Sequence, residues 1–368
     1  MKVVAPGRVC LFGEHQDYFG LSVVAMAIDK KLSIEVTPTS HQSVLVHMPD
    51  INKTDQFELK YPLPYNSSRD YVRAGLNVFA KMGFKLEKPF HATIRSLIPI
   101  AAGCSSSSAL CVGWTKTLSE ILNHPQKDDA EWIAQTAFKI EVLEFQEGGG
   151  MMDHYASSLG GMLSINFEKD IPTYERLEYP WKGLLLCNSD TQKETVETIK
   201  NHKKIVLGAL SKMSLQRPLR GLAMIKPKTL ASLSIKELKS SKNKLSQEEY
   251  DRLLATITNR DLCKKACAVI HNASNMREES TLLGQLFNEQ QQTISKLLKL
   301  STPQIDHLLE LALKAGALGG KVNGSGGGGT FIVFAPDKYE GVQKVLKENG
   351  CKSELIHPST GVHIEKPA

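Results

Sequence analysis

Four consecutive serines, Ser105–Ser108, follow the small residues AAGC at positions 101–104. The preceding segment His91–Leu97 alternates polar and apolar residues like a strand, whereas Ser106–Leu122 repeats apolar residues every three or four positions like a helix. A helix that begins here presents unpaired N–H groups and a partial positive charge to the loop. Small residues let a phosphate approach that backbone, and serine hydroxyls can reach a phosphate oxygen or a magnesium ion. The stretch therefore predicts a phosphate site; the simpler alternative is a serine-rich helix cap.

The composition limits the class of protein that can contain this loop. The chain has 368 residues, of which 41% are hydrophobic and 23% charged, which suits two or three globular domains. It contains no run of about 18 apolar residues that could cross a membrane, and its first residues lack the apolar core of a signal peptide. We therefore expect a soluble, cytoplasmic protein with no membrane partner.

The cysteines indicate the same compartment. There are seven, an odd number, and no C-x-x-C pair is present, which favours reduced thiols in a cytosolic protein. Cys263 and Cys267 lie four residues apart, but no matching Cys/His pair accompanies them, so we do not expect a zinc site.

The net charge of +6 is distributed unevenly. Residues 193–244 contain 13 lysines and arginines against three acidic residues. Such a segment can bind nucleic acid or another polyanion, but it lacks interleaved aromatic residues and any recognised nucleic-acid motif. We favour a solvated basic surface near an anionic small molecule, and we expect no nucleic-acid partner.

The remaining periodicity predicts an α+β fold that becomes richer in helix after about residue 190. Predicted strands lie at 3–4 and 8–12, on either side of a break at Pro6–Gly7, and at 32–36, 43–47, 162–166 and 183–187. Predicted helices lie at 73–82, 129–147, 194–209, 234–256, 261–274, 281–298, 303–315 and 341–349.

A second loop of small residues lies near the C-terminal end, in KVNGSGGGGTFIVF from Lys321 to Phe334. It contains G-x-G-x-x-G at Gly324, Gly326 and Gly329, but it leads into an apolar strand where a dinucleotide site needs a helix. The Walker pattern G-x-x-x-x-G-K-[ST] is absent from the chain. We interpret the glycines as a close backbone approach to another group, with a flexible turn as the alternative.

Two further stretches place polar residues beside glycines. PGRVCLFGEHQDYFG at 6–20 concentrates Arg8, Glu14, His15 and Asp17 beside glycines. EGGGMMDHYASSLGG at 147–161 places Asp153 between a glycine triplet and small residues, where a helix can begin. Any one of these residues is also explained as a surface charge or a helix cap, but the combination indicates a polar binding site.

Together the four stretches resemble the sugar-kinase branch of the GHMP kinase superfamily, and its galactokinases most closely. PGRVCLFGEHQDYFG is similar to the galactokinase signature, PIAAGCSSSSA to the ATP loop, GGMMDHYAS to the catalytic-aspartate segment and KVNGSGGGGTFIVF to the C-terminal glycine motif. All four occur in family order across nearly the whole chain. The resemblance implies a two-domain fold: a mixed N-terminal domain with a βαβ region at 1–180, and a helix-rich C-terminal domain with a small antiparallel sheet at 181–368.

The resemblance also implies an ATP- and magnesium-dependent kinase that phosphorylates the anomeric hydroxyl of galactose, as a monomer or weak homodimer. Asp153 would be the catalytic base with Arg8 facing it, and Ser107 and Glu141 would bind magnesium. The sugar would contact Glu14, His15, Asp17 and Gly150. The nucleotide would be held by Gly103, Cys104, Ser105, Ser106, Ser107, Ser108, Gly324 and Gly326.

Several positions depart from the galactokinase pattern. Cys10 stands where the family usually has asparagine, Phe19 where it has a polar residue, and Lys200 where it has a tyrosine that contacts galactose. These departures concern the sugar rather than phosphoryl transfer. The same chemistry on arabinose, a uronic acid or an amino sugar therefore remains an alternative, as does a non-catalytic sensor of sugar and ATP.

Overall fold

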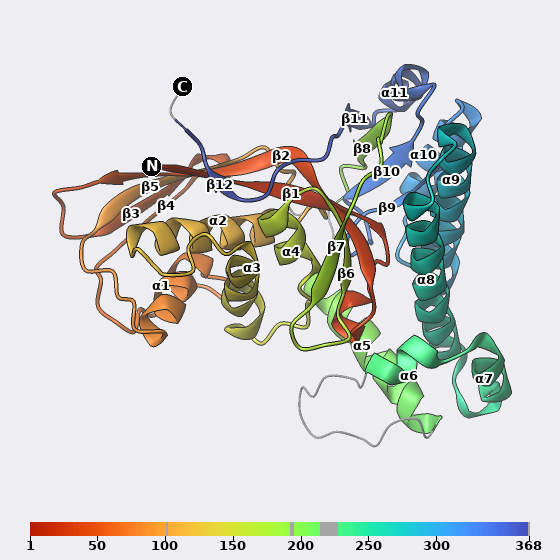
Figure 1. Ribbon diagram of the computed structural model, residues 1–368, viewed down its shortest axis with the longest axis horizontal. Helices are drawn as coiled ribbons and strands as arrows, with labels where there is room; N and C mark the ends of the chain where they lie inside the picture. The colour runs from red at the N-terminus through yellow and green to blue at the C-terminus, as the bar shows by residue number, and fades with distance from the viewer. Residues whose placement is uncertain (101, 192–194, 214–226, 367–368) are drawn as a thin grey trace.

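The computed structural model describes residues 1–100, 102–191, 195–213 and 227–366, and two β-sheets organise them (Figure 1). The first sheet has eight strands in the order β12-β1-β2-β5-β3-β4, with β6 paired to β2 and β7 paired to β6. It is a mixed sheet, because β3 runs parallel to β5 while β1 and β2 are antiparallel. Its strands are β1 Lys2–Phe12, β2 Val23–Pro38, β3 Val44–Met48, β4 Lys53–Phe57, β5 Phe90–Ser96, β6 Met162–Asn166, β7 Thr173–Leu177 and β12 His363–Ile364.

Four helices cover one face of this sheet and lie below it in Figure 1: α1 Tyr71–Lys81, α2 Ser106–Ile121, α3 Ala130–Phe138 and α4 Met152–Leu159. The alternating residues Leu32, Ile34 and Val36 of β2 are buried in the core beneath it. Trp114 of α2 is fully buried in the same core, and its indole N–H donates to the carbonyl of Val72 at 3.1 Å. This packing fixes α2, and with it the serine run at its start.

The second sheet has four antiparallel strands in the order β11-β8-β10-β9: β8 Leu184–Asn188, β9 Gly319–Val322, β10 Thr330–Phe334 and β11 Lys352–Leu355. Every residue of β10 is buried, as its continuous apolar sequence TFIVF predicts for a strand covered on both faces. The helices of this half are α5 Thr195–Lys212, α6 Pro227–Ser232, α7 Ile235–Ser240, α8 Gln247–His271, α9 Met276–Gln292, α10 Pro303–Lys314 and α11 Tyr339–Glu348.

The predicted α+β fold is confirmed, with a mixed sheet followed by a helix-rich part that contains a small antiparallel sheet. The loop between β7 and β8, where residues 180 and 181 lie, joins the two sheets. The chain then crosses back near its C-terminal end, where β12 pairs Ile364 with Val3 of β1.

Two predicted elements in the first half have different bounds. β1 runs unbroken through Pro6–Gly7, because a shift in its register with β2 between Pro6 and Arg8 absorbs the irregularity. The helix predicted at 129–147 ends as α3 at Phe138 and continues as a π-helical turn, Lys139–Leu143.

The helices of the second half also differ from the prediction. Those expected at 234–256 and 261–274 are instead the short α7 and the single long α8, because Ser246 and Glu249 form a capping box that starts α8. The helix expected at 281–298 begins earlier, as α9, and ends in a π-helical turn, Thr293–Leu298.

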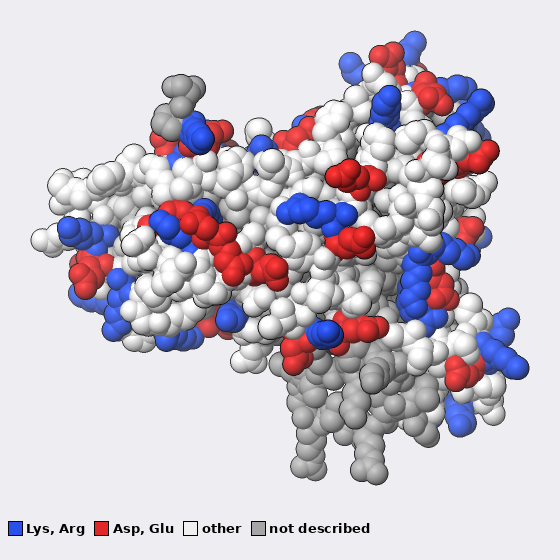
Figure 2. Space-filling model, in the orientation of Figure 1, with Lys and Arg blue, Asp and Glu red and all other residues white. Residues whose placement is uncertain are grey.

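The surface carries charges of both signs. Figure 2 shows lysines and arginines interspersed with acidic residues over the face that it presents. Of the basic segment 193–244, residues 193–194 and 214–226 lie outside the described residues, and most of the rest forms α5, α6 and α7. All seven cysteines are free thiols.

Within the described ranges, the helices are all too short or too polar to span a membrane.

Candidate active site

A cavity of about 490 Å³ is lined by residues from all four sequence stretches. The residues predicted for the site that line it are Arg8, Glu14, His15, Asp17, Gly103, Ser105, Ser106, Ser107, Ser108, Glu141, Gly150, Asp153 and Gly324. The fold thus brings together groups that lie more than 300 positions apart in the chain.

The serine run forms the junction between the loop after β5 and the start of α2. Ser105 has a left-handed backbone with φ of 58° and is the N-cap of α2, yet its side chain makes no capping hydrogen bond. The alternative interpretation as a simple helix cap is therefore not supported. Ser106–Ser108 form the first turn of α2 and line the cavity. Their position at a helix N-terminus suits an anion.

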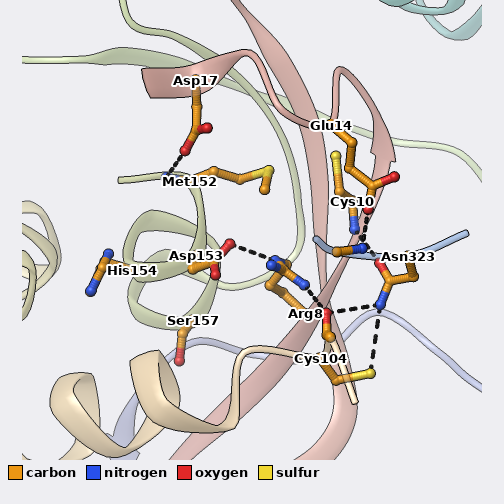
Figure 3. A network of polar contacts seen from close by, with 12 residues as sticks. Arg8, Cys10, Glu14, Asp17, Cys104, Met152, Asp153, His154, Ser157 and Asn323 are labelled. Carbon is orange, nitrogen blue, oxygen red and sulfur yellow. Dashed lines mark hydrogen bonds and ion pairs between the residues drawn. The ribbon is translucent and has the colours of Figure 1, made fainter. Parts of the chain in front are cut away.

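Arg8 of β1 and Asp153 of α4 form an ion pair in the cavity wall, with Arg8 Nε 2.7 Å from Asp153 Oδ1 (Figure 3). Arg8 Nη1 donates to the carbonyl of Gly103 at 2.5 Å, which links the pair to the serine loop. Burial by itself would raise the pKa of Asp153, but the charge and hydrogen bond of Arg8 outweigh it and hold that pKa below its usual value. Asp153 is therefore a carboxylate at neutral pH.

Glu141 lies in the π-helical turn after α3, beside the serine loop. One carboxylate oxygen is 2.7 Å from His154 Nε2. Burial would raise the pKa of Glu141, but His154 and the hydroxyls of Ser107 and Ser108 outweigh it and lower that pKa. A carboxylate next to serine hydroxyls offers the hard oxygen ligands that magnesium prefers. π-Helical turns frequently occur at functional sites, and this one holds Glu141, which the resemblance implied as a magnesium ligand.

Asp17 and Gly150 meet in the cavity wall, and Figure 3 shows the carboxylate of Asp17 directed at Met152, next to Asp153 in the chain. Asp17 Oδ2 accepts a hydrogen bond from the N–H of Met152 at 3.2 Å. A Cβ atom at position 150 would collide with the Asp17 carboxylate, so only glycine fits there while Asp17 keeps its place. Burial, assisted by repulsion from Asp153, raises the pKa of Asp17 to about 6.

His15 stands near Asp17 and faces α5. Its Nδ1 is 3.1 Å from the hydroxyl of Tyr18, and its ring meets that of His202 edge-on, with 5.9 Å between centroids. From α5, Ile199 lines the cavity whereas the side chain of Lys200 is exposed. The departure at position 200 therefore does not place an ammonium group in the cavity wall.

Glu14 lines the cavity, but protein groups engage its carboxylate. One oxygen pairs with Lys321 Nζ of β9, and the other accepts from the N–H of Gly324. The side chains of Lys321 and Glu14 are 0% and 2% exposed. Burial raises the pKa of Glu14 despite the attraction of Lys321. The carboxylate therefore carries contacts that its expected role as a sugar ligand does not explain.

Comparisons with known proteins agree with this geometry. Residues 70–161 match the GHMP kinases N terminal domain, residues 272–350 match GHMP kinases C terminal, and residues 2–38 match the galactokinase galactose-binding signature. The chain belongs to the GHMP kinase family. It is therefore an ATP-dependent phosphotransferase.

The relatives of this GHMP kinase include mevalonate kinases and galactokinases. A mevalonate kinase of Methanocaldococcus jannaschii is 26% identical over 95% of both chains, and a galactokinase of Mannheimia succiniciproducens is 25% identical over 99% of this chain and 94% of the relative. Among solved structures, Lactococcus lactis galactokinase complexed with galactose superposes with a TM-score of 0.84 at 20% identity, covering 99% of this chain and 95% of that one.

Two residues predicted to hold the nucleotide do not line the cavity of this GHMP kinase. Cys104 is fully buried; its carbonyl accepts from the N–H of Arg8 at 3.2 Å. Gly326 packs against Leu300, whose backbone leaves no room for a Cβ. Both positions support the loops around the cavity from behind.

The buried polar residues at the site that were not predicted include His154, Lys321 and Asn323. His154 directly follows Asp153 in the chain, and its Nε2 lies 2.7 Å from Glu141. Lys321 and Asn323 are two positions apart, so they lie on the same face of an extended segment. Polar residues at that spacing immediately before a glycine loop were the available signal, but their partners lie near the other end of the chain.

Proposed function

We propose that this GHMP kinase is a galactokinase, which transfers the γ-phosphoryl group of ATP to the anomeric hydroxyl of galactose. The observation that carries the proposal is the Arg8–Asp153 ion pair, which shares one cavity with the serine loop and with Asp17. The match of residues 2–38 to the galactose-binding signature supports the choice of sugar.

In this proposal the phosphates of ATP lie at the N-terminus of α2, against Ser106–Ser108, where unpaired N–H groups and the helix dipole favour negative charge. The guanidinium of Arg8, anchored on Gly103, adds a fixed cation. The nucleoside would occupy the apolar part of the cavity, lined by Leu32, Met48, Ile94, Pro99 and Leu110.

Asp153 would orient the acceptor hydroxyl and take its proton during phosphoryl transfer. The lowered pKa keeps this carboxylate ionised at neutral pH, so it can accept a hydrogen bond from the hydroxyl. The same low pKa makes it a weak base. We therefore expect the proton to move late, after the bond between oxygen and phosphorus has begun to form.

Magnesium fits the oxygen ligands at Glu141 and Ser107, which the side-chain contacts bring together. When bound, the ion would neutralise charge on the transferring phosphate. His154, 2.7 Å from Glu141, would fix the orientation of that carboxylate.

The acceptor would contact Asp17, His15 and the backbone at Gly150, and the charges of the cavity favour a neutral sugar. Both arginines that line it have carboxylate partners, Arg8 with Asp153 and Arg69 with Glu147. No lysine is among the described lining residues. A uronic acid would therefore add a negative charge next to Asp17, and Lys203 of α5, whose charge acts on Asp17, is not among the residues that line the cavity.

Mevalonate is the second candidate acceptor, because mevalonate kinases are relatives of this chain at similar identity. Mevalonate carries a carboxylate, so the same argument about charge disfavours it. The galactose-binding signature at residues 2–38 favours the sugar as well.

The test measures the release of ADP when the protein is incubated with ATP, magnesium and one candidate acceptor at a time. The acceptors are galactose, glucose, arabinose, glucuronate, galacturonate, N-acetylgalactosamine and mevalonate. Phosphorus NMR of each product then identifies the phosphorylated position. We expect turnover on galactose and a phosphate on its anomeric carbon. Turnover on galacturonate or mevalonate but not galactose would refute the proposed acceptor. Binding of galactose and ATP without turnover would instead support a sensor.

Three further expectations accompany this proposal. We propose that residues 1–180 and 181–368 form the two domains, with β12 joining the first sheet. We place the protein in the cytoplasm, for which seven free thiols are supporting evidence. We expect it to act as a monomer or a weak homodimer.

A further inference from the structure

The segment of β9 that leads into the glycine loop makes buried polar contacts that the mechanism above does not use. We propose that Lys321 and Asn323 are positioning residues that form a clamp: Lys321 holds the loop carrying Glu14, and Asn323 holds the serine loop at Gly103. The clamp thereby fixes the acceptor side and the phosphate side of the cavity relative to each other. The inference rests on the proposed function for the identity of those two sides.

Asn323 is the centre of the clamp, with no exposed surface. Its Oδ1 accepts from the N–H of Cys10 on β1 at 3.0 Å, and its Nδ2 donates to the carbonyl of Gly103 at 3.0 Å (Figure 3). Nδ2 also lies 3.2 Å from the hydroxyl of Thr330. One amide therefore joins the strand that carries Arg8, the serine loop and the start of β10.

The carbonyl of Gly103 is shared between the clamp and the ion pair. It accepts from Asn323 Nδ2 and also from Arg8 Nη1, at 3.0 and 2.5 Å. Without Asn323, Arg8 alone would hold this carbonyl, and Arg8 is at the same time bound to Asp153. A shift of the serine loop would then change the position of the phosphates relative to Asp153.

Backbone contacts show how closely the two loops approach. A Cβ atom at Gly324 would stand 2.8 Å from the carbonyl oxygen of Gly103. The N–H of Thr330 donates to the carbonyl of Ala102 at 2.7 Å. The glycines therefore allow the glycine loop to contact the serine loop directly, and the amide of Asn323 fixes the position of one loop against the other.

Lys321 completes the clamp on the acceptor side. Its ammonium pairs with Glu14 and donates to its neighbouring carbonyl of Val322 at 2.8 Å. The other oxygen of Glu14 binds the N–H of Gly324. Glu14 therefore connects the loop that carries Asp17 to the same glycine loop that contacts Gly103.

The first test compares Asn323→Ala with Asn288→Ala. Asn288 of α9 contacts the same strand, accepting from Gly320 N–H at 3.2 Å and donating to Leu318 O at 3.0 Å, but it does not line the cavity. Both variants lose side-chain hydrogen bonds to the backbone. We expect Asn323→Ala to bind magnesium ATP about tenfold more weakly and to lower kcat about 100-fold, while Asn288→Ala changes neither.

Calorimetric titration with magnesium ATP separates this inference from the proposed function, because it needs no sugar. Equal ATP affinities and equal melting temperatures of the two variants would overturn the role of Asn323. A wild-type protein that binds ATP but phosphorylates no sugar would overturn the proposed function alone, and the difference in ATP affinity would still support the clamp.

The second test is a double-mutant cycle on the acceptor side with Glu14→Gln, Lys321→Met and the double variant. If Glu14 acts through Lys321, the effects on kcat will be non-additive, and the double variant will be no worse than Lys321→Met. If Glu14 is instead a direct sugar ligand, Glu14→Gln will raise the KM for the sugar by the same factor in both backgrounds. That additive result would overturn the role of Lys321 as a positioning residue.

Discussion

Two carboxylates near β1 are each paired with a buried cation, yet their environments push their pKa values in opposite directions. Arg8 outweighs burial and lowers the pKa of Asp153, whereas Lys321 does not outweigh burial at Glu14, whose pKa is raised. The side chain of Asp153 is 26% exposed and that of Glu14 is 2% exposed. The more exposed carboxylate, Asp153, can contact a substrate, whereas the buried Glu14 holds two loops together.

The largest expected effect is the loss of turnover when the more exposed carboxylate, Asp153, is changed. Asp153→Asn keeps the shape of the side chain but removes the proton acceptor, so we expect kcat to fall about 1,000-fold with little change in ATP affinity. Steady-state kinetics and calorimetric ATP titration measure the two effects. Asp128→Asn, which alters a carboxylate that is 82% exposed and lies outside the cavity, is the control. Unchanged turnover in Asp153→Asn would remove this residue from the mechanism.

The buried Lys321–Glu14 pair should also contribute to stability. Lys321→Met leaves Glu14 buried without its main cation, and we expect a loss of about 3 kcal/mol in the free energy of unfolding at pH 8. A carboxyl whose pKa is raised in the folded state destabilises it as pH rises above the ordinary value. The loss should therefore be smaller at pH 5 than at pH 8, because a raised pKa makes Glu14 take up a proton more readily as the pH falls.

Urea unfolding of Lys321→Met at both pH values provides this measurement. The other groups that act on Glu14 are Arg8, the thiol of Cys10 and the N–H of Gly324, and all of them are unchanged in the variant. The Glu14→Gln/Lys321→Met double variant has no carboxyl to titrate there, so its loss should not depend on pH. Equal losses for Lys321→Met at pH 5 and pH 8 would contradict the argument.

A smaller effect is expected where glycine makes room for Asp17. A Cβ in Gly150→Ala would displace the Asp17 carboxylate, so we expect kcat/KM for the sugar to fall about 100-fold while ATP affinity is kept. Gly148→Ala is a matched control, because its Cβ would have only an ordinary contact, at 3.5 Å from Lys200 Cγ. Equal kinetics for the two variants would argue against Asp17 as a sugar ligand.

The smallest effect concerns pH. With its pKa near 6, Asp17 is ionised above that pH and can accept hydrogen bonds from sugar hydroxyls with both oxygens. We expect kcat/KM for the sugar to fall about tenfold from pH 7 to pH 5 as Asp17 takes up a proton. Asp153 stays ionised over that range and does not contribute to the fall. The pH profile of Asp17→Asn should lose this step, and a profile that keeps it would assign the step to another group.

Local patterns predicted much of the site, because its parts begin as short segments with a recognisable chemistry. The serine run, the Arg8 stretch and the glycines before Asp153 each lie within about a dozen residues, and the cavity joins them. The partner of Glu14 could not be found in this way. Lys321 lies 307 positions away, on a strand of the second sheet, and the folded chain brings it to Glu14.

Element boundaries were harder to predict for a related reason. The periodicity of 129–147 fits one helix, but the turn at Lys139–Leu143 is π-helical, and one extra residue per turn leaves little trace in an amphipathic pattern. The start predicted at residue 234 agrees with Ser234, the N-cap of α7. The capping box at Ser246 and Glu249 was also visible in the sequence, and it would have corrected the prediction of one unbroken helix from 234 to 256.

The bond from Asn323 to Gly103 spans 220 positions of the chain, and it has a consequence during protein synthesis. At translation speeds of roughly 5–20 residues per second, the serine loop leaves the ribosome roughly ten to forty seconds before the amide that fixes it. If the serine loop holds ATP as proposed, a nascent chain in that interval has an incomplete nucleotide site. We therefore expect the growing polypeptide to bind ATP tightly only after the glycine loop has emerged and docked.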